Sequence, residues 1–92
     1  MNEKEEQQYL KIEGYDNALV GVASVWDTSG NQEERLIYNG EAILTILVQR
    51  DGMTFEEGME FISTNIEAAY VGPLTPIIVW ETTMEDIEGE QQ

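Results

Sequence analysis

The chain contains neither cysteine nor histidine, and only four of its 92 residues are basic. Without cysteine it has no disulfide bridge and no thiolate ligand for a metal, a composition that fits a reducing cytoplasm. Without histidine it lacks the side chain that most often serves as a general base, a pH switch or a metal ligand. We therefore expect a non-enzymatic protein with no catalytic residues, no metal site and no cofactor.

Long apolar runs are also missing, since no stretch approaches the roughly 20 residues needed to span a bilayer. Residues 1–8 are polar and acidic, whereas a signal peptide begins with basic and then apolar residues. We therefore expect a cytoplasmic protein that does not bind a membrane. Residues 1–8 are predicted to be a disordered polar tail and residues 81–92 a disordered acidic tail, on either side of one domain over residues 9–80.

Acidic residues dominate what is present: nineteen Asp and Glu give a formal net charge of −15. Residues 9–80 carry eleven carboxylates and three basic side chains, so −8 of that charge lies on the expected domain. Such a surface repels nucleic acid backbones and anionic membranes and attracts basic proteins. The predicted partner is a basic protein surface, and direct binding of nucleic acid is not expected.

Two short strands open the predicted domain. Residues 18–26 are rich in valine and apolar on both faces, which predicts an interior strand. Residues 35–38 predict a second strand, and the polar loop between them makes the pair an antiparallel hairpin. The loop begins at Asp27 and is rich in oxygen ligands, but its glycine falls at the fourth position rather than the sixth that a calcium loop needs. A hairpin turn is therefore predicted there.

Two helices and a last strand follow the hairpin. Asn39 is placed to cap a helix over residues 40–51. Thr54 and Glu57 have the spacing of a capping box, which predicts the start of a second helix. With a short strand over residues 75–80, the fold class is α+β: a two-layer β-β-α-α-β arrangement in which a small antiparallel or mixed sheet packs on a helix pair.

The second helix is predicted to have two contrasting faces. Its apolar stripe, at steps of four and three residues, is expected to face the core: Phe55, Met59, Ile62, Ile66 and Ala69. The outer face carries Glu56, Glu60 and Glu67 in a row, with Glu57 beside them. One helical turn separates these charges by roughly 5–6 Å, a spacing similar to that of phosphates along one DNA strand. The row indicates either imitation of nucleic acid or a solvated helix face.

Several turn, cap and core motifs occur together between residues 15 and 80. They include Tyr15-Asp16-Asn17-Ala18, Leu36-Ile37-Tyr38-Asn39, Arg50-Asp51-Gly52-Met53, Asn65-Ile66-Glu67-Ala68 and Thr75-Pro76-Ile77. In this combination the chain resembles a family of small uncharacterised proteins of bacteriophages and prophages. The resemblance implies a protein acting in a bacterial cytoplasm, and it carries over no reaction and no catalytic residue.

The acidic surface and this resemblance together favour an inhibitor that binds a basic host protein. A nucleic-acid-binding enzyme is the expected kind of target, as for an anti-restriction or anti-CRISPR protein that mimics DNA. The predicted partner-binding residues lie on the second helix and in the hairpin: Glu56, Glu57, Glu60, Glu67, Glu33 and Glu34.

Aromatic residues support a second hypothesis. Trp26 and Trp80 each end a predicted strand and are expected to lie side by side in the sheet; with Tyr70 they are candidate apolar contacts. This favours a structural or adaptor module, or a homodimer formed through an apolar sheet face. A third hypothesis is a protein that binds or sequesters a small ligand, which requires a polar pocket.

Overall fold

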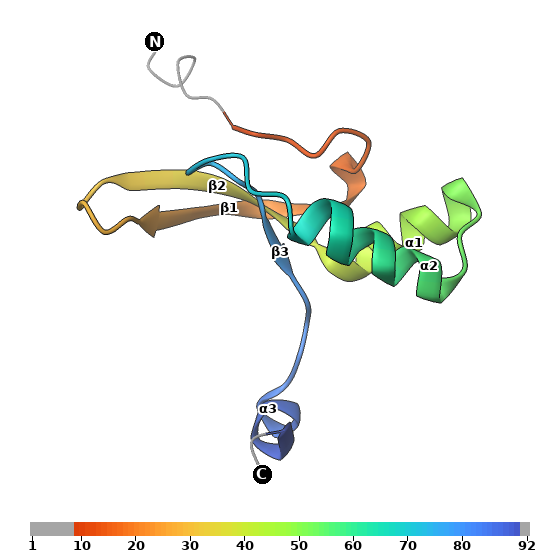
Figure 1. Cartoon of the computed structure of the whole chain (residues 1–92). Coiled ribbons are helices and arrows are strands. Elements are labelled where there is room, and N and C mark those ends of the chain that lie inside the picture. Colours follow the sequence, from red (N-terminus) through yellow and green to blue (C-terminus); the bar gives the residue numbers. More distant parts are fainter. Residues whose placement is uncertain (1–8, 91–92) are drawn as a thin grey trace.

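The structure is a computed structural model that describes residues 9–90. Its elements, in chain order, are the 3₁₀ turn η2 (Asp16–Ala18), strands β1 (Leu19–Trp26) and β2 (Gln32–Asn39), helices α1 (Gly40–Asp51) and α2 (Phe55–Phe61), the π-helix η3 (Ile62–Glu67), strand β3 (Ile77–Val79) and helix α3 (Met84–Glu90). The sheet has the order β1-β2-β3, with β1 antiparallel and β3 parallel to β2 (Figure 1). The predicted α+β fold class with a small mixed sheet is confirmed.

The β1–β2 hairpin forms where the sequence predicts it, although β2 is longer than expected. Its turn is organised by Asp27, whose Oδ1 accepts hydrogen bonds from the backbone N–H groups of Ser29 and Asn31, both at 2.9 Å. An aspartate that accepts from the backbone two and four residues on is a common way to stabilise such a turn. The hairpin-turn prediction for this loop is therefore confirmed.

The prediction that the first strand is interior is wrong. Strand β1 lies at the edge of the sheet and has β2 as its one neighbour among the described residues. Val20, Val22 and Trp26 are exposed. Apolar residues on both faces of this strand therefore indicated neither its burial nor the number of its neighbouring strands. The parallel pairing of β3 places the last strand on the other side of β2.

Both predicted helix starts are confirmed. Helix α1 follows β2 directly, and the Oδ1 atom of Asn39 accepts hydrogen bonds from the N–H groups of Glu41 (2.8 Å) and Ala42 (3.2 Å). Helix α2 starts with a complete capping box, in which Thr54 N–H donates to Glu57 (2.9 Å) and Glu57 N–H donates to Thr54 Oγ1 (3.1 Å). These side chains satisfy backbone donors that a helix start leaves unpaired.

The apolar stripe predicted for the second helix is only partly correct. Phe55 is 64% exposed, and Met59 and Ala69 are exposed as well, whereas Ile62 is buried and Ile66 half-buried. The contact with α1 is centred on Gly58, where an added Cβ would lie 2.6 Å from Leu44 Cδ1. A pattern of apolar side chains cannot locate this contact, because it depends on a position that has none.

The core consists of seven buried residues contributed by the N-terminal segment, β2, α1 and η3: Tyr15, Ala18, Leu36, Tyr38, Ile43, Leu47 and Ile62. The hydroxyl of Tyr38 accepts a hydrogen bond from Ile12 N–H (3.1 Å) and so connects the first described residues to the sheet. Helices α1 and α2 lie at one end of the sheet, so the far half of the hairpin projects beyond them (Figure 1). The chain between residues 9 and 90 has no helix with the length and apolar character needed to cross a bilayer.

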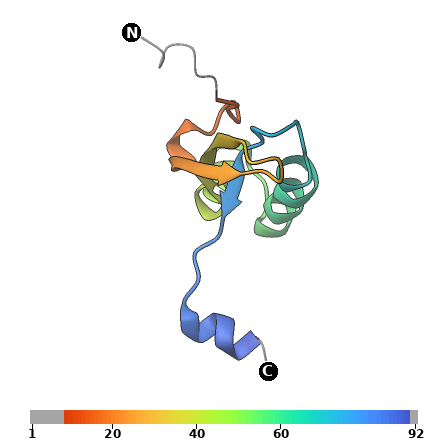
Figure 2. The same cartoon turned by 90° about the vertical axis from the view of Figure 1, so that its left-hand side faces the viewer.

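Residues 84–90 correct the prediction of a disordered acidic tail over residues 81–92. They form α3, which an extended segment separates from the rest of the fold (Figures 1 and 2). Thr83 caps this helix, since its Oγ1 accepts a hydrogen bond from Asp86 N–H (3.1 Å). Glu85 and Asp86 lie in the first turn, where negative charge is favoured by the helix dipole. Residues 1–8 and 91–92, predicted as tail, lie outside the described residues.

Candidate functional site

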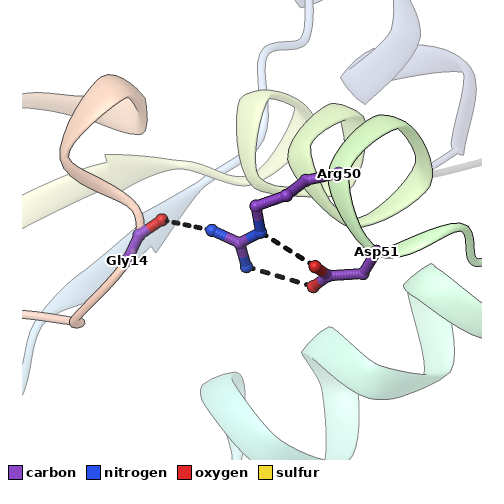
Figure 3. A network of polar contacts seen from close by, with 3 residues as sticks. All are labelled: Gly14, Arg50 and Asp51. Carbon is purple, nitrogen blue, oxygen red and sulfur yellow. Dashed lines mark hydrogen bonds and ion pairs between the residues drawn. The ribbon is translucent and has the colours of Figure 1, made fainter.

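Each of the three basic residues of the described chain contacts another group of the same chain. Arg50 is the most engaged: it donates to Gly14 O (2.8 Å) and to both carboxylate oxygens of Asp51 (2.9 and 3.0 Å), as Figure 3 shows. Its guanidinium also lies over the Tyr15 ring, 5.0 Å from the centroid. The hydrogen bonds to Arg50 lower the pKa of Asp51, and those to Asp51 raise the pKa of Arg50.

The other two basic residues neutralise little of the acidic surface. Arg35 donates from Nε to the carbonyl oxygen of Thr75 (2.5 Å), and Lys11 lies 3.5 Å from Asp16. Residues 9–80 contain eleven carboxylates, and two of these form an ion pair with a basic side chain. The domain keeps a strong negative field, which is the electrostatic property predicted from the sequence.

The structure does not keep the predicted carboxylate row of the second helix in one line. After Phe61 the helix is bonded i→i+5, so each turn takes more residues and the positions that follow rotate around the axis. Glu67 accepts a hydrogen bond from Trp80 Nε1 (2.7 Å), and Glu57 belongs to the capping box. Of these four carboxylates, those of Glu56 and Glu60 accept no hydrogen bond from the described part of the chain. The helix thus presents two carboxylates without an internal partner, while Glu57 and Glu67 keep their charge but are held in place by hydrogen bonds.

The hairpin carboxylates project from opposite faces of β2. Glu34 accepts a hydrogen bond from the hydroxyl of Tyr9 (2.9 Å), and this bond raises the pKa of Tyr9 because the phenolate would face a carboxylate. Glu33 pairs in register with Val25 of β1 and lies on the other face. Glu33 and Glu34, both predicted as partner-binding residues, therefore lie on different surfaces.

Trp26 and Trp80 do not lie side by side, which corrects the prediction. Trp26 pairs with Gln32 at the far end of the hairpin, whereas Trp80 follows β3 at the base of the sheet. Because β3 runs parallel to β2, its last residues lie near the end of β2 and away from the hairpin turn. Trp80 is half-buried against Gly40, and Trp26 is 65% exposed. Trp80 therefore has a structural role at the start of α1.

Trp26 instead shares a pocket with Tyr70, and we call this the hairpin pocket. It has a volume of about 350 Å³ and is lined by Val25, Trp26, Asp27, Glu33, Arg35, Tyr70, Gly72 and Pro73. It thus brings together three residues nominated from the sequence: Glu33 for its charge, and Trp26 and Tyr70 as aromatic contacts. Sequence reasoning missed Arg35 and Pro73 in this wall. The one signal available was that Arg35 is the only basic residue in either strand of the hairpin.

A second hollow, of about 430 Å³, lies between the N-terminal segment, the end of η3 and the loop before β3. Its lining is mainly apolar, including Leu10, Ile66, Ala69 and Val71, with Lys11 and Glu13 at the same site. This composition offers few of the converging polar groups that orient a small ligand. Within residues 9–90, no three acidic side chains come together as metal ligands would.

Comparisons of the chain with protein-family models, with curated proteins and with solved structures find no match. The resemblance to bacteriophage and prophage proteins therefore stays a prediction from the sequence.

Proposed function

We propose that this protein acts without catalysis, by binding a basic partner protein through its negatively charged surface. The observation that carries the proposal is the use of the basic residues. Arg35 and Arg50 hold backbone carbonyl oxygens, and Lys11 pairs with a single aspartate. The remaining carboxylates face solvent without a cation of their own, so a basic surface is the complement that relieves their mutual repulsion.

The class of partner expected from the sequence is a nucleic-acid-binding protein whose basic groove the acidic domain occupies. The Debye length of about 10 Å at 0.1 M salt sets the range of this attraction. Charges spread over α2 and the hairpin therefore act together at low ionic strength. A partner that normally holds a phosphate backbone has the density of basic residues that such a field attracts.

The test measures the affinity of the domain for a nuclease and for a repressor, each with a basic DNA-binding groove. Dissociation constants are measured from low to high salt, with and without a DNA competitor. We expect affinity to fall as salt rises and DNA to compete, and we expect the double variant with Glu56→Gln and Glu60→Gln to bind more weakly. The neutral replacement Gln49→Ala on α1 is the matched control. A dissociation constant that changes neither with salt concentration nor with added DNA contradicts the proposal.

A second candidate function is self-association through β1, in keeping with an adaptor or structural module. It is favoured by the exposure of Leu19, Val20, Val22 and Trp26 along a strand that carries no charge. Two copies repel each other, so salt strengthens a homodimer while it weakens the complex with a basic partner. Light scattering at low and high ionic strength separates the two functions by the sign of the salt effect.

A further inference from the structure

Strand β1 presents an unprotected edge. Its eight residues, Leu-Val-Gly-Val-Ala-Ser-Val-Trp, contain no charged residue and no proline, which are the usual means of blocking edge-to-edge pairing. An irregularity in the register between Leu19 and Gly21 disturbs the start of the strand. The remaining run, 21–26, pairs regularly with β2, and no strand of residues 9–90 lies along its outer edge. Such an edge can accept an extended segment as a further strand.

The hairpin pocket lies at the end of this edge. Val25 and Glu33 are register partners, so their side chains project from the same face of the hairpin. Two large aromatic residues with high exposure also line the pocket, Tyr70 at 75% and, at the end of the strand, Trp26 at 65%. Trp26 pairs with Gln32, so its side chain leaves the strand on the face opposite Val25 and Glu33. Aromatic faces next to a carboxylate form the environment that a guanidinium or ammonium group prefers. Strand edge and pocket are therefore continuous through β1.

The charges of the pocket favour a cation over an anion. Asp27 and Glu33 contribute two carboxylates against the one guanidinium of Arg35. Arg35 is directed to the loop before β3 by its hydrogen bond to Thr75 O. Among the described residues, the cation that lies over an aromatic ring is Arg50, on Tyr15, so the faces of Trp26 and Tyr70 are not occupied in this way. The net charge of the domain further repels an anionic ligand.

We propose that the β1 edge and the hairpin pocket form one docking site for an extended basic segment of the partner protein. The segment adds to β1 as a fourth strand, and an arginine or lysine opposite Val25 enters the pocket. Neighbouring strands lie about 4.8 Å apart, so this residue starts about 10 Å from the strand that carries Glu33. The side chains of arginine and glutamate together span that distance. The inference rests on the proposed function, because it specifies where the basic partner binds.

A second copy of the chain fits this site less well than a basic segment does. Strand β1 of another copy carries no basic side chain to place against Glu33. It also brings a further net charge of −15 toward an already negative surface. Charge complementarity therefore selects the basic segment as the occupant.

The experiment uses a blocked octapeptide that alternates arginine with valine, titrated into the full ¹⁵N-labelled chain. We expect the indole N–H resonance of Trp26 to move, while that of Trp80, bonded to Glu67, stays in place. By calorimetry, Glu33→Gln and Trp26→Ala are each expected to weaken binding by about two- to fivefold. Glu41→Gln on α1, which removes one exposed carboxylate outside the hairpin pocket, is the matched control and should bind like the wild type. A peptide that alternates arginine with proline, which cannot complete a strand, should bind more weakly.

The outcomes separate the inference from the proposed function. If the arginine–valine peptide binds and the two pocket variants bind it as the wild type does, the inference is wrong and the proposed function stands. The same holds if the valine and proline peptides bind equally. If neither the peptides nor the basic proteins bind at low salt, both proposals fail. Trp26 is largely exposed and Glu33→Gln keeps the size of the side chain, so at least one variant folds for the comparison.

Discussion

The contact between Gly40 and Trp80 gives the sharpest prediction for stability. Gly40 is the first residue of α1 and is buried, and a Cβ added there would lie 2.5 Å from two atoms of the Trp80 indole. An indole is rigid, so the whole ring must move, and its hydrogen bond to Glu67 (2.7 Å) is lost or lengthened. The backbone of Gly40 does not have a positive φ, so alanine fits the helix itself.

Overpacking of this kind costs about 1–3 kcal/mol, and the better helix propensity of alanine returns up to about 1 kcal/mol. We therefore expect Gly40→Ala to lower the free energy of unfolding by about 1–2 kcal/mol. For a domain of this size the midpoint of thermal unfolding should fall by roughly 5–15 °C. Urea unfolding followed by circular dichroism measures the first quantity, and a thermal melt the second.

A double-mutant cycle isolates the cause, because the three nearest atoms to the added Cβ all belong to Trp80. In a Trp80→Ala background the clash is absent, and Gly40→Ala should be neutral or stabilising. The coupling between the two positions should be about 2 kcal/mol. Equal destabilisation in both backgrounds refutes the reasoning, and so does a Gly40→Ala variant as stable as the wild type.

Three further predictions concern the helix cap Asn39, the stability of the protein at acidic pH and helix α3. Asn39→Ala removes an acceptor for two N–H groups and should cost about 1 kcal/mol in urea unfolding, with exposed Gln49→Ala near zero as its control. The pKa of Asp51 is lowered in the folded state, so the Asp51 carboxylate stabilises the fold fully at neutral pH and loses this effect as the pH falls through the lowered pKa. The difference in unfolding free energy between the wild type and Asp51→Asn should therefore shrink below pH about 4. A persistent difference in acid contradicts this. Removal of residues 84–92 should leave the thermal midpoint unchanged, since α3 supplies no core residue, and a large drop would show that α3 packs on the domain.

The elements predicted correctly are those that depend on signals a few residues apart. Asp27, Asn39 and the pair Thr54 and Glu57 each act on backbone N–H groups within four positions of their own. Such side chains specify a turn or a helix start whatever the rest of the chain does. The hairpin and both helix starts could therefore be predicted from the sequence.

The π-helix and the edge position of β1 could not be predicted in this way. The sequence of η3 contains no glycine or proline, although Thr64 Oγ1 donates to Glu60 O (2.9 Å), a bond that often distorts helices. A pattern evaluated at 3.6 residues per turn assumes a regular helix, and the carboxylate row that ended at Glu67 depended on that assumption. The position of β1 depends on which side of β2 the last strand pairs, and that is a long-range choice.

The candidate site shows the same division. Glu33, Trp26 and Tyr70 were nominated from the sequence for their charge or aromatic character. Their meeting in one pocket depends on where the loop over residues 70–73 crosses the hairpin, after two helices and the π-helix. Residue types that suit binding can thus be recognised in a sequence, while the combination that forms a site requires the folded chain.

Asn39 belongs to two elements at once, since it is the last residue of β2 and the cap of α1. No loop residue separates the strand from the helix. A slip of β2 by one residue would exchange the faces of the hairpin, and it would also move the cap relative to the helix pair that packs beside it. The register of the hairpin is therefore fixed at its base as well as at the turn that Asp27 organises. Residues inserted into the turn around Gly30 are therefore expected to leave the strand pairing next to α1 unchanged.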